Sequence, residues 1–314
     1  MEPDTTLSMP AKIGPYDIHV RLHSTKAIFL ATDAKTGEKV VIKKSRPHRK
    51  NNDLGEQLLL YEAELQYRCR HPHVVQLKEL MRHDGELYIV TKYSGRNLRE
   101  QKELPIERKL TVLDQLAQAI LHCHKQGVIH MDVKRENVLL NGTTRLTDFD
   151  ASRPIKEDHP YFEQGLVVGT PSSLAPEYWQ KGEFSTRTDV FQYSLLAYQL
   201  LFNQEPFGMY ERDGDDWIAY DKPRYNATEF NAHGQFGGHI YFGLSENPEN
   251  RPEMEDLART IKEQAAKLHR QQSAKTSKPY HDPSRAGRYP KIEPEQRTKV
   301  SYASGQPRQQ ALPS

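Results

Sequence analysis

The amino-acid sequence predicts an α+β protein with a strand-rich first part and a mostly helical second part. Residues 11 to 92 alternate short apolar stretches around one helical pattern, which is typical of an antiparallel sheet with one main helix. Residues 98 to 270 carry apolar positions that recur every three or four residues. Beyond residue 270, Pro, Ser, Gln, Lys and Arg dominate. We therefore expect a small sheet lobe, a larger helical lobe and a disordered basic tail over residues 271 to 314.

The first part contains one clear strand and one clear helix. The run EKVVIKK, residues 38 to 44, alternates β-branched and charged residues and is expected to form a strand. The run from Gly55 to Leu77 has a helical pattern that should end at His71 and Pro72. We interpret residues 1 to 10 as an N-terminal extension.

The second part begins with a helix and a hairpin. Residues 107 to 127 have the apolar spacing of a helix, and Gly127 is expected to cap its C-terminal end. Asn141 and Gly142 stand between two short apolar runs. This dipeptide favours a tight turn, so a β-hairpin is predicted there.

Polar side chains stand at short, fixed separations around this hairpin. Asp132 and Asn137 are five residues apart, and Asp148 follows the hairpin, which should fold it back over Asp132. Transfer of the terminal phosphoryl group of a nucleotide needs Mg²⁺ held by oxygen ligands and an acceptor hydroxyl held in line. Two carboxylates and an amide in this order favour that chemistry, although Asp and Asn beside a turn more often serve as simple caps.

These motifs resemble the catalytic loop and the metal-binding segment of the eukaryotic-type Ser/Thr protein kinase family. The matching residues are His130, Asp132, Asn137, Asp148 and Phe149. The resemblance implies that Asp132 accepts or orients the proton of a substrate hydroxyl, and that Asn137 and Asp148 hold Mg²⁺, or alternatively Mn²⁺. It further implies that Lys134 neutralises charge on the transferring phosphate.

The resemblance extends to the first part. Lys43, on the predicted strand, matches the lysine that grips the phosphates of ATP, and Glu62 matches the glutamate that pairs with it. Residues 93 to 97 would be the hinge between two lobes. The resemblance implies that five further residues line the nucleotide site, namely Ile28, Val41, Thr91, Tyr93 and Leu139.

Three later motifs follow in the family's order. They are GTPSSLAPE at residues 169 to 177, the apolar helical run at residues 188 to 202, and ENRPEMEDL around Arg251. The resemblance implies that Glu177 pairs with Arg251 and that Thr170 contacts Asp132. The implied fold is two-lobed, with a kinase domain over residues 11 to 270.

The predicted phosphate-covering loop departs from the family pattern. The three glycines of the family fall at about Arg21, His23 and Lys26. Glycine lets backbone amides approach phosphate closely, and side chains with a Cβ would stiffen or lift the loop. These three residues either offer positive charge to phosphate in place of amides or simply face water.

A second departure concerns regulation. Met131 replaces the arginine that usually precedes the catalytic aspartate and that pairs with a phosphate on the activation segment. We therefore expect that phosphorylation of this segment does not control activity. Alanine should be tolerated at the three serines of the segment, Ser152, Ser172 and Ser173.

Two more departures lie near Phe149. Asp150 replaces the glycine that usually follows this phenylalanine, and either biases one backbone conformation or adds a metal ligand. Gln66 falls where an apolar residue would stack toward Phe149, and Val41 falls where a small alanine usually contacts adenine. The residues at positions 66 and 41 both indicate an atypical active state.

Composition sets broad limits. The 314 residues carry 44 Lys and Arg against 42 Asp and Glu, a balance that argues against nucleic acid as the main partner. The two cysteines are too few for a disulfide framework, so a reducing compartment is expected. No apolar run approaches about 18 residues, which predicts no membrane span. We expect a cytoplasmic protein, with delivery into another cell as the alternative.

Three functional hypotheses follow from the sequence. The first is an active Ser/Thr protein kinase that uses ATP and a protein substrate, because every catalytic residue of the family has its match. The second is a pseudokinase that binds nucleotide or a partner without turnover, suggested by the glycine-free loop and Asp150. The third is a small-molecule phosphotransferase, against which the GTPSSLAPE segment argues.

Overall fold

The computed structural model describes residues 9–45, 52–156, 169, 171–208, 212–213, 216–217 and 224–276. The chain divides into two compact units, residues 1–272 and 273–314. The last helix ends at Thr276, six residues past residue 270, where the sequence suggested that the kinase domain ends. The rest of the predicted tail lies outside the described residues.

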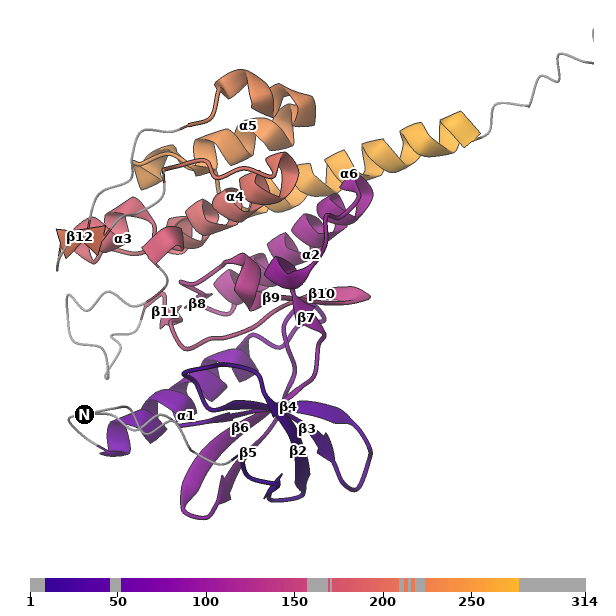
Figure 1. Ribbon diagram of the computed structural model, residues 1–314. Coiled ribbons are helices and arrows are strands. Elements are labelled where there is room, and N and C mark those ends of the chain that lie inside the picture. The colour runs from indigo at the N-terminus through magenta and orange to yellow at the C-terminus, as the bar shows by residue number, and fades with distance from the viewer. Residues whose placement is uncertain are drawn as a thin grey trace, which may run out of the picture. The chain divides into compact units, whose positions relative to one another are not determined.

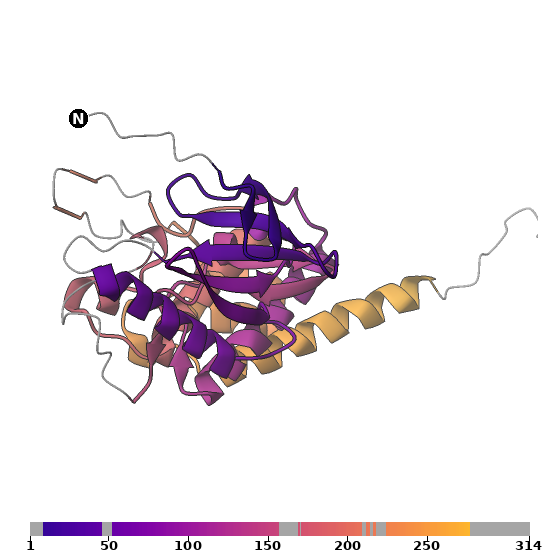
Figure 2. The same ribbon diagram turned by 90° about the horizontal axis from the view of Figure 1, so that it is seen from below.

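Six strands form one antiparallel sheet in the order β1-β2-β3-β4-β6-β5 (Figure 1). Their bounds are β1 Lys12–Ile13, β2 Tyr16–Arg21, β3 Ile28–Asp33, β4 Lys39–Lys44, β5 Leu77–His83 and β6 Glu86–Lys92. Helix α1, Asn52–Arg68, packs beside β5 and β6 (Figures 1 and 2). The predicted sheet lobe with one main helix is confirmed.

Strand β4 shows how residue alternation orients the site. Val40 and Ile42 are buried in the core of the sheet lobe with Phe29 and Val90. Because successive side chains of a strand point to opposite faces, the register that buries Val40 and Ile42 turns Lys43 to the other face. The hydrophobic pattern of one short strand therefore aims the lysine.

Helix α1 ends earlier than its apolar pattern indicated. The pattern suggested an end at His71 and Pro72, but the helix stops at Arg68. A turn follows, in which the amide of Val74 donates to the carbonyl of His71 at 3.0 Å. Proline disfavours the helical conformation of the residue before it, and here the chain leaves the helix one turn sooner.

The second lobe consists mainly of helices, which lie above the sheet lobe in Figure 1. Their bounds are α2 Ile106–Lys125, α3 Pro176–Lys181, α4 Thr186–Phe202, α5 Gly234–Gly243 and α6 Met254–Thr276. Helix α4 is buried along most of its length and forms the centre of the core. Among the described residues no helix is long and apolar enough to cross a membrane.

Short strands lie where the two lobes meet. They are β7 Arg96–Asn97, β8 Val128–Ile129, β9 Val138–Asn141, β10 Thr143–Leu146 and β11 Arg153–Pro154, and a separate ribbon pairs β12 Arg212–Asp213 with β13 Asp216–Trp217. The predicted hairpin is confirmed, since β9 and β10 pair across Gly142, whose φ is +70°. The segment between the lobes pairs with the same hairpin through β7 and β9. Gly95 is required there, because a Cβ would lie 2.0 Å from the carbonyl oxygen of Leu140.

Candidate active site

Helix α4 holds the segment that carries the candidate catalytic residues. The carboxylate of Asp189 accepts the backbone amides of His130 and Met131, each at 2.8 Å. Gln192, one turn further along α4, accepts the amide of Val133 at 2.8 Å and donates to the carbonyl of Met131 at 2.7 Å. A buried helix thus fixes the backbone on both sides of Asp132.

This anchoring holds a strained backbone. Met131 has a φ of +69°, which is uncommon for a residue with a side chain. Such a conformation persists only where the surroundings over-determine it, and the contacts from Asp189 and Gln192 do so. The sequence reading did not single out Gln192. The available signal was a polar residue three positions after Asp189, within the mostly apolar run of residues 190 to 202.

The β9–β10 hairpin brings Asp148 to the same place. The amide of Thr147 donates to the carbonyl of Asn137 at 3.0 Å, which closes the base of the hairpin. Asp148 follows with a φ of +66°. His130 supports this segment from below, with its Nε2 3.1 Å from the carbonyl oxygen of Thr147 and its ring 4.9 Å from that of Phe149.

Asp132 is buried, and its two oxygens have different surroundings. Its Oδ2 accepts Lys134 Nζ at 2.6 Å and Asn137 Nδ2 at 2.9 Å. Its Oδ1 is buried and has no hydrogen-bond partner among the described residues. A buried acceptor without a partner is costly, so this oxygen is suited to receive a hydroxyl from outside the chain. Thr170, the expected neighbour of Asp132, lies outside the described residues.

Lys43 joins the two lobes. Its Nζ lies 2.7 Å from Glu62 Oε1 on α1 and 2.8 Å from Asp148 Oδ1. Burial disfavours charge on Lys43, but the neighbouring carboxylates, Asp148 first among them, outweigh it and raise its pKa. For Glu62, burial is the larger effect and raises the pKa to about 7, although Lys43 opposes the shift. The pairing of Lys43 with Glu62 that the sequence suggested is present.

A second lysine reaches the same aspartate. Lys26 Nζ lies 3.2 Å from Asp148 Oδ2 and 3.1 Å from Asp150 Oδ2. Burial disfavours charge on Asp148, but Lys43 and Lys26 hold its pKa well below the usual range. Of the three residues that replace the family's loop glycines, Lys26 therefore faces the site, while Arg21 and His23 are exposed.

The five residues assigned to the nucleotide come from both lobes. They are Ile28 on β3, Val41 on β4, Thr91 on β6, Tyr93 in the connecting segment and Leu139 on β9. All five are half-buried, in contrast to the fully buried core around them. The sheet registers Val41 with Thr91 and Ile28 with Lys43. Val41 therefore offers partly exposed surface on the strand that carries the lysine, and Ile28 and Thr91 do so on the two neighbouring strands.

Apolar and backbone contacts hold those parts of the activation segment that the structure describes. Met131 is fully buried in a cluster with Ile129, Ala151, Leu174 and Tyr178. Ser152 is also buried, and its hydroxyl donates to the carbonyl of His130 at 3.1 Å. Ser152 is therefore a structural residue, and only Ser172 among the three serines is exposed.

Two further sequence predictions can be compared with the structure. Glu177 pairs with Arg251 through two hydrogen bonds of 2.8 and 2.7 Å, both buried, which confirms that expectation. Gln66 is buried and donates to the carbonyl of Val75 at 2.9 Å. The polar side chain thus ties α1 to the segment after it, in place of an apolar contact toward Phe149.

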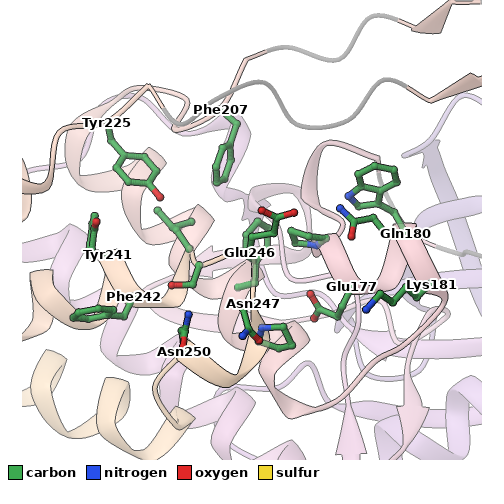
Figure 3. Close-up of a pocket in the computed structure, with 16 residues that line it drawn as sticks. Glu177, Gln180, Lys181, Phe207, Tyr225, Tyr241, Phe242, Glu246, Asn247 and Asn250 are labelled. Carbon is green, nitrogen blue, oxygen red and sulfur yellow. The ribbon is translucent and has the colours of Figure 1, made fainter.

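A hollow lies in the helical lobe. It encloses about 1060 Å³ and is lined by α3, α5 and the segment after α5. Phe207, Tyr225 and Tyr241 form an aromatic side, with Gln180 and Lys181 across from them (Figure 3). None of the residues assigned to nucleotide, metal or proton transfer lines this hollow, so it is separate from the candidate active site.

Three features lie between the sheet lobe and the helical lobe, namely a lysine–glutamate pair, an aspartate–asparagine loop and a second aspartate. Together they define the architecture of a phosphotransferase. The protein kinase domain family matches residues 24–273. This chain belongs to the protein kinase family.

Individual relatives are more distant. The chain is 27% identical over 189 residues to serine/threonine-protein kinase ULK3 of Rattus norvegicus, covering 57% of this chain and 39% of the rat protein. It is 31% identical over 155 residues to serine/threonine-protein kinase Nek3 of Mus musculus, covering 46% and 30%. A relative from Acanthamoeba polyphaga mimivirus is 24% identical over 260 residues, covering 77% and 91%. The chain thus spans well under half the length of these mammalian relatives.

Proposed function

We propose that this protein is a Ser/Thr protein kinase that transfers the γ-phosphoryl group of ATP to a hydroxyl of a protein substrate. The observation that carries the proposal is the position of Lys43, which bridges Glu62 at 2.7 Å and Asp148 at 2.8 Å. The pair of Lys43 with Glu62 must be in place in an active kinase, and Asp148 must be close enough to hold a metal beside it. The serine/threonine class is supported by the names of the relatives.

The donor set fits a magnesium ion. Asp148 offers carboxylate oxygens, and Asn137, whose Nδ2 is bonded to Asp132, keeps its amide oxygen for a metal. No cluster of three His, Cys, Asp or Glu side chains suited to a metal occurs among the described residues. Asp148 and Asn137 would hold Mg²⁺ or Mn²⁺ together with the phosphates of the nucleotide. When bound, the metal neutralises charge on the phosphates.

The residues of the chain divide the remaining work. Asp132 Oδ1 accepts the hydrogen bond of the substrate hydroxyl and takes its proton as the oxygen attacks phosphorus and the bond to the leaving ADP oxygen breaks. Lys134, 2.6 Å from the other oxygen of Asp132, lies close enough to offset charge on the transferring group. Lys43 orients the phosphates of the nucleotide.

Regulation by phosphorylation of the activation segment is not part of this proposal. At the position where the family places an arginine, the apolar side chain of Met131 is buried. A phosphate needs a cationic or amide partner, and Met131 supplies neither. We propose that packing around Met131 holds the described residues at the two ends of the segment.

The test is transfer of label from ATP to a basic protein substrate, with wild type, Asp132→Asn and Asp148→Ala compared in Mg²⁺ and in Mn²⁺. Labelling by the wild type, lost in both variants, is the expected result. Nucleotide binding by the wild type without any labelling would favour the pseudokinase hypothesis. One observation favours the pseudokinase hypothesis. Lys26 Nζ lies 3.2 Å from Asp148 Oδ2, where it would compete with a metal.

A further inference from the structure

Two departures from the family pattern meet in space. Lys26 stands where the loop has a glycine, and Asp150 stands where a glycine follows Phe149. The two residues are 124 positions apart in sequence, and their Nζ and Oδ2 atoms are 3.1 Å apart. Each substitution alone would place a charge near the phosphate site, and together they neutralise one another. This pairing indicates that they act as a unit.

The turn that carries Lys26 is braced by its own side chains. His23 Nδ1 accepts the backbone amides of Thr25 and Lys26, each at 3.1 Å. Arg21 Nε donates to the carbonyl of Lys26 at 3.3 Å. A glycine loop binds phosphate through free amides, but here these two amides are already bonded. The loop therefore presents the ammonium group of Lys26 in their place.

Both oxygens of Asp148 are occupied by lysines. Lys43 takes Oδ1 and Lys26 takes Oδ2. A metal ion that binds Asp148 competes with these two ammonium groups for its oxygens. Lys43 is also anchored on buried Glu62, so its removal would leave a buried carboxylate without its partner. Lys26 has Asp150 as a second acceptor and can leave Asp148 without losing all its contacts.

We infer that Lys26 is the phosphate contact that replaces the loop amides, and that Asp150 is the positioning residue that holds its ammonium group when metal takes Asp148. The inference rests on the proposed function, because it requires nucleotide and metal at this site. The inference predicts that Asp150 has opposite effects on nucleotide affinity in the presence and in the absence of Lys26. Asp150 helps nucleotide binding while Lys26 is present. When Lys26 is absent, the negative charge of Asp150 loses its nearer cation, with Lys43 Nζ remaining at 3.6 Å from its Oδ2, and repels phosphate more strongly.

The experiment measures the dissociation constants of Mg²⁺-ATP, and of Mn²⁺ without nucleotide, for four proteins besides the wild type. These are Lys26→Met, Asp150→Gly, the double variant and Lys12→Met. Lys12 is the matched control, because it forms an exposed ion pair with Asp17 in the same sheet lobe. Lys26→Met should weaken Mg²⁺-ATP binding about 10- to 100-fold, the worth of a charge-assisted hydrogen bond. It should tighten binding of Mn²⁺ alone, because a competing cation is gone.

The double variant decides whether the pair is a unit. Asp150→Gly alone should weaken nucleotide binding, yet in the Lys26→Met background it should strengthen it. Asp150→Glu should retain most of the wild-type affinity. Equal nucleotide affinity in Lys26→Met and wild type, or additive effects in the double variant, would overturn the inference while leaving the proposed function intact. A wild type that binds no nucleotide would overturn the proposed function itself, and this inference with it.

Discussion

Asp132 and Asp148 lie in one site but differ in how their oxygens are used. Asp132 has one oxygen bonded to Lys134 and Asn137 and one buried oxygen without a partner among the described residues. Asp148 has both oxygens on lysines. The first carboxylate keeps one acceptor oxygen without a partner among the described residues, whereas both oxygens of the second are already shared with cations.

The difference follows from where the charges come from. Asp132 is held by the backbone anchoring of α4 and needs no ligand to keep its position. Asp148 stands among Lys43, Lys26 and Asp150, so its ionised form is kept by opposite charges that reach it from the other lobe. Under the proposed function, proton transfer would be pre-organised by the helical lobe, and metal binding would compete with lysines that come from the sheet lobe.

The largest expected effect comes from replacing one oxygen of the Asp132 carboxylate with an amide nitrogen. Asp132→Asn should lower kcat by about 10²- to 10⁴-fold, because the amide cannot take the hydroxyl proton. The dissociation constant of Mg²⁺-ATP should change little, since Asp148 and Lys43 are untouched. Single-turnover transfer and nucleotide titration together check this. A weakened nucleotide affinity with a normal rate would show that Asp132 has been assigned the wrong role.

The next largest effect is expected from substituting Lys43, one of the two lysines that contact Asp148. Lys43→Met should reduce transfer about 10²-fold or more, because it deprives the phosphates and Asp148 of the same cation. Its melting temperature should also fall, since Glu62 loses its buried partner. Lys44→Met is the control, because Lys44 is on the same strand but pairs with Glu86 at 3.0 Å. Equal behaviour of the two variants would remove Lys43 from the site.

A smaller effect appears in the dependence on pH. The pKa of Glu62 is raised by burial to about 7. Its ionised form pairs with Lys43, so kcat/KM should rise with pH through about 7, and Glu62→Gln should lose this limb. The free energy of unfolding should depend on pH in the opposite direction. A carboxyl whose folded pKa is raised contributes stability below its unfolded pKa, near 4.5, and loses it as pH rises through about 7.

The pH prediction is checked with two profiles. One is kcat/KM against pH, and the other is the free energy of unfolding against pH, each for wild type and Glu62→Gln. The wild type should lose stability relative to the variant between about pH 4.5 and 7. Parallel curves in both profiles would mean that Glu62 does not titrate in this range.

The smallest effect tests regulation. Ser172→Ala should leave activity within about twofold of wild type, because the serine is exposed and Met131 cannot bind a phosphate placed there. Ser152 does not serve for this test, since its buried hydroxyl bonds to the carbonyl of His130. The earlier expectation that its alanine variant is neutral therefore does not follow. Activity measured with protein treated by a phosphatase gives an independent check, and a large loss there would overturn the regulatory proposal.

The sequence determined the local elements and the residues of the site. Alternation along residues 38 to 44 buried Val40 and Ile42 and so aimed Lys43, and the Asn141–Gly142 turn returned Asp148 to the neighbourhood of Asn137. These outcomes depend on short-range periodicity and turn chemistry. Both can be read from neighbouring residues, because the interactions that set them act over a few positions in the chain.

The tertiary structure decided how distant charges pair. No pattern in the sequence shows that Lys26 meets Asp150, or that Gln192 on α4 holds the amide of Val133. Such contacts depend on the packing of one lobe or element on another, to which sequence spacing gives no guide. The partners of each aspartate oxygen were likewise decided by burial and by residues from the rest of the fold, since local propensity carries no information on either.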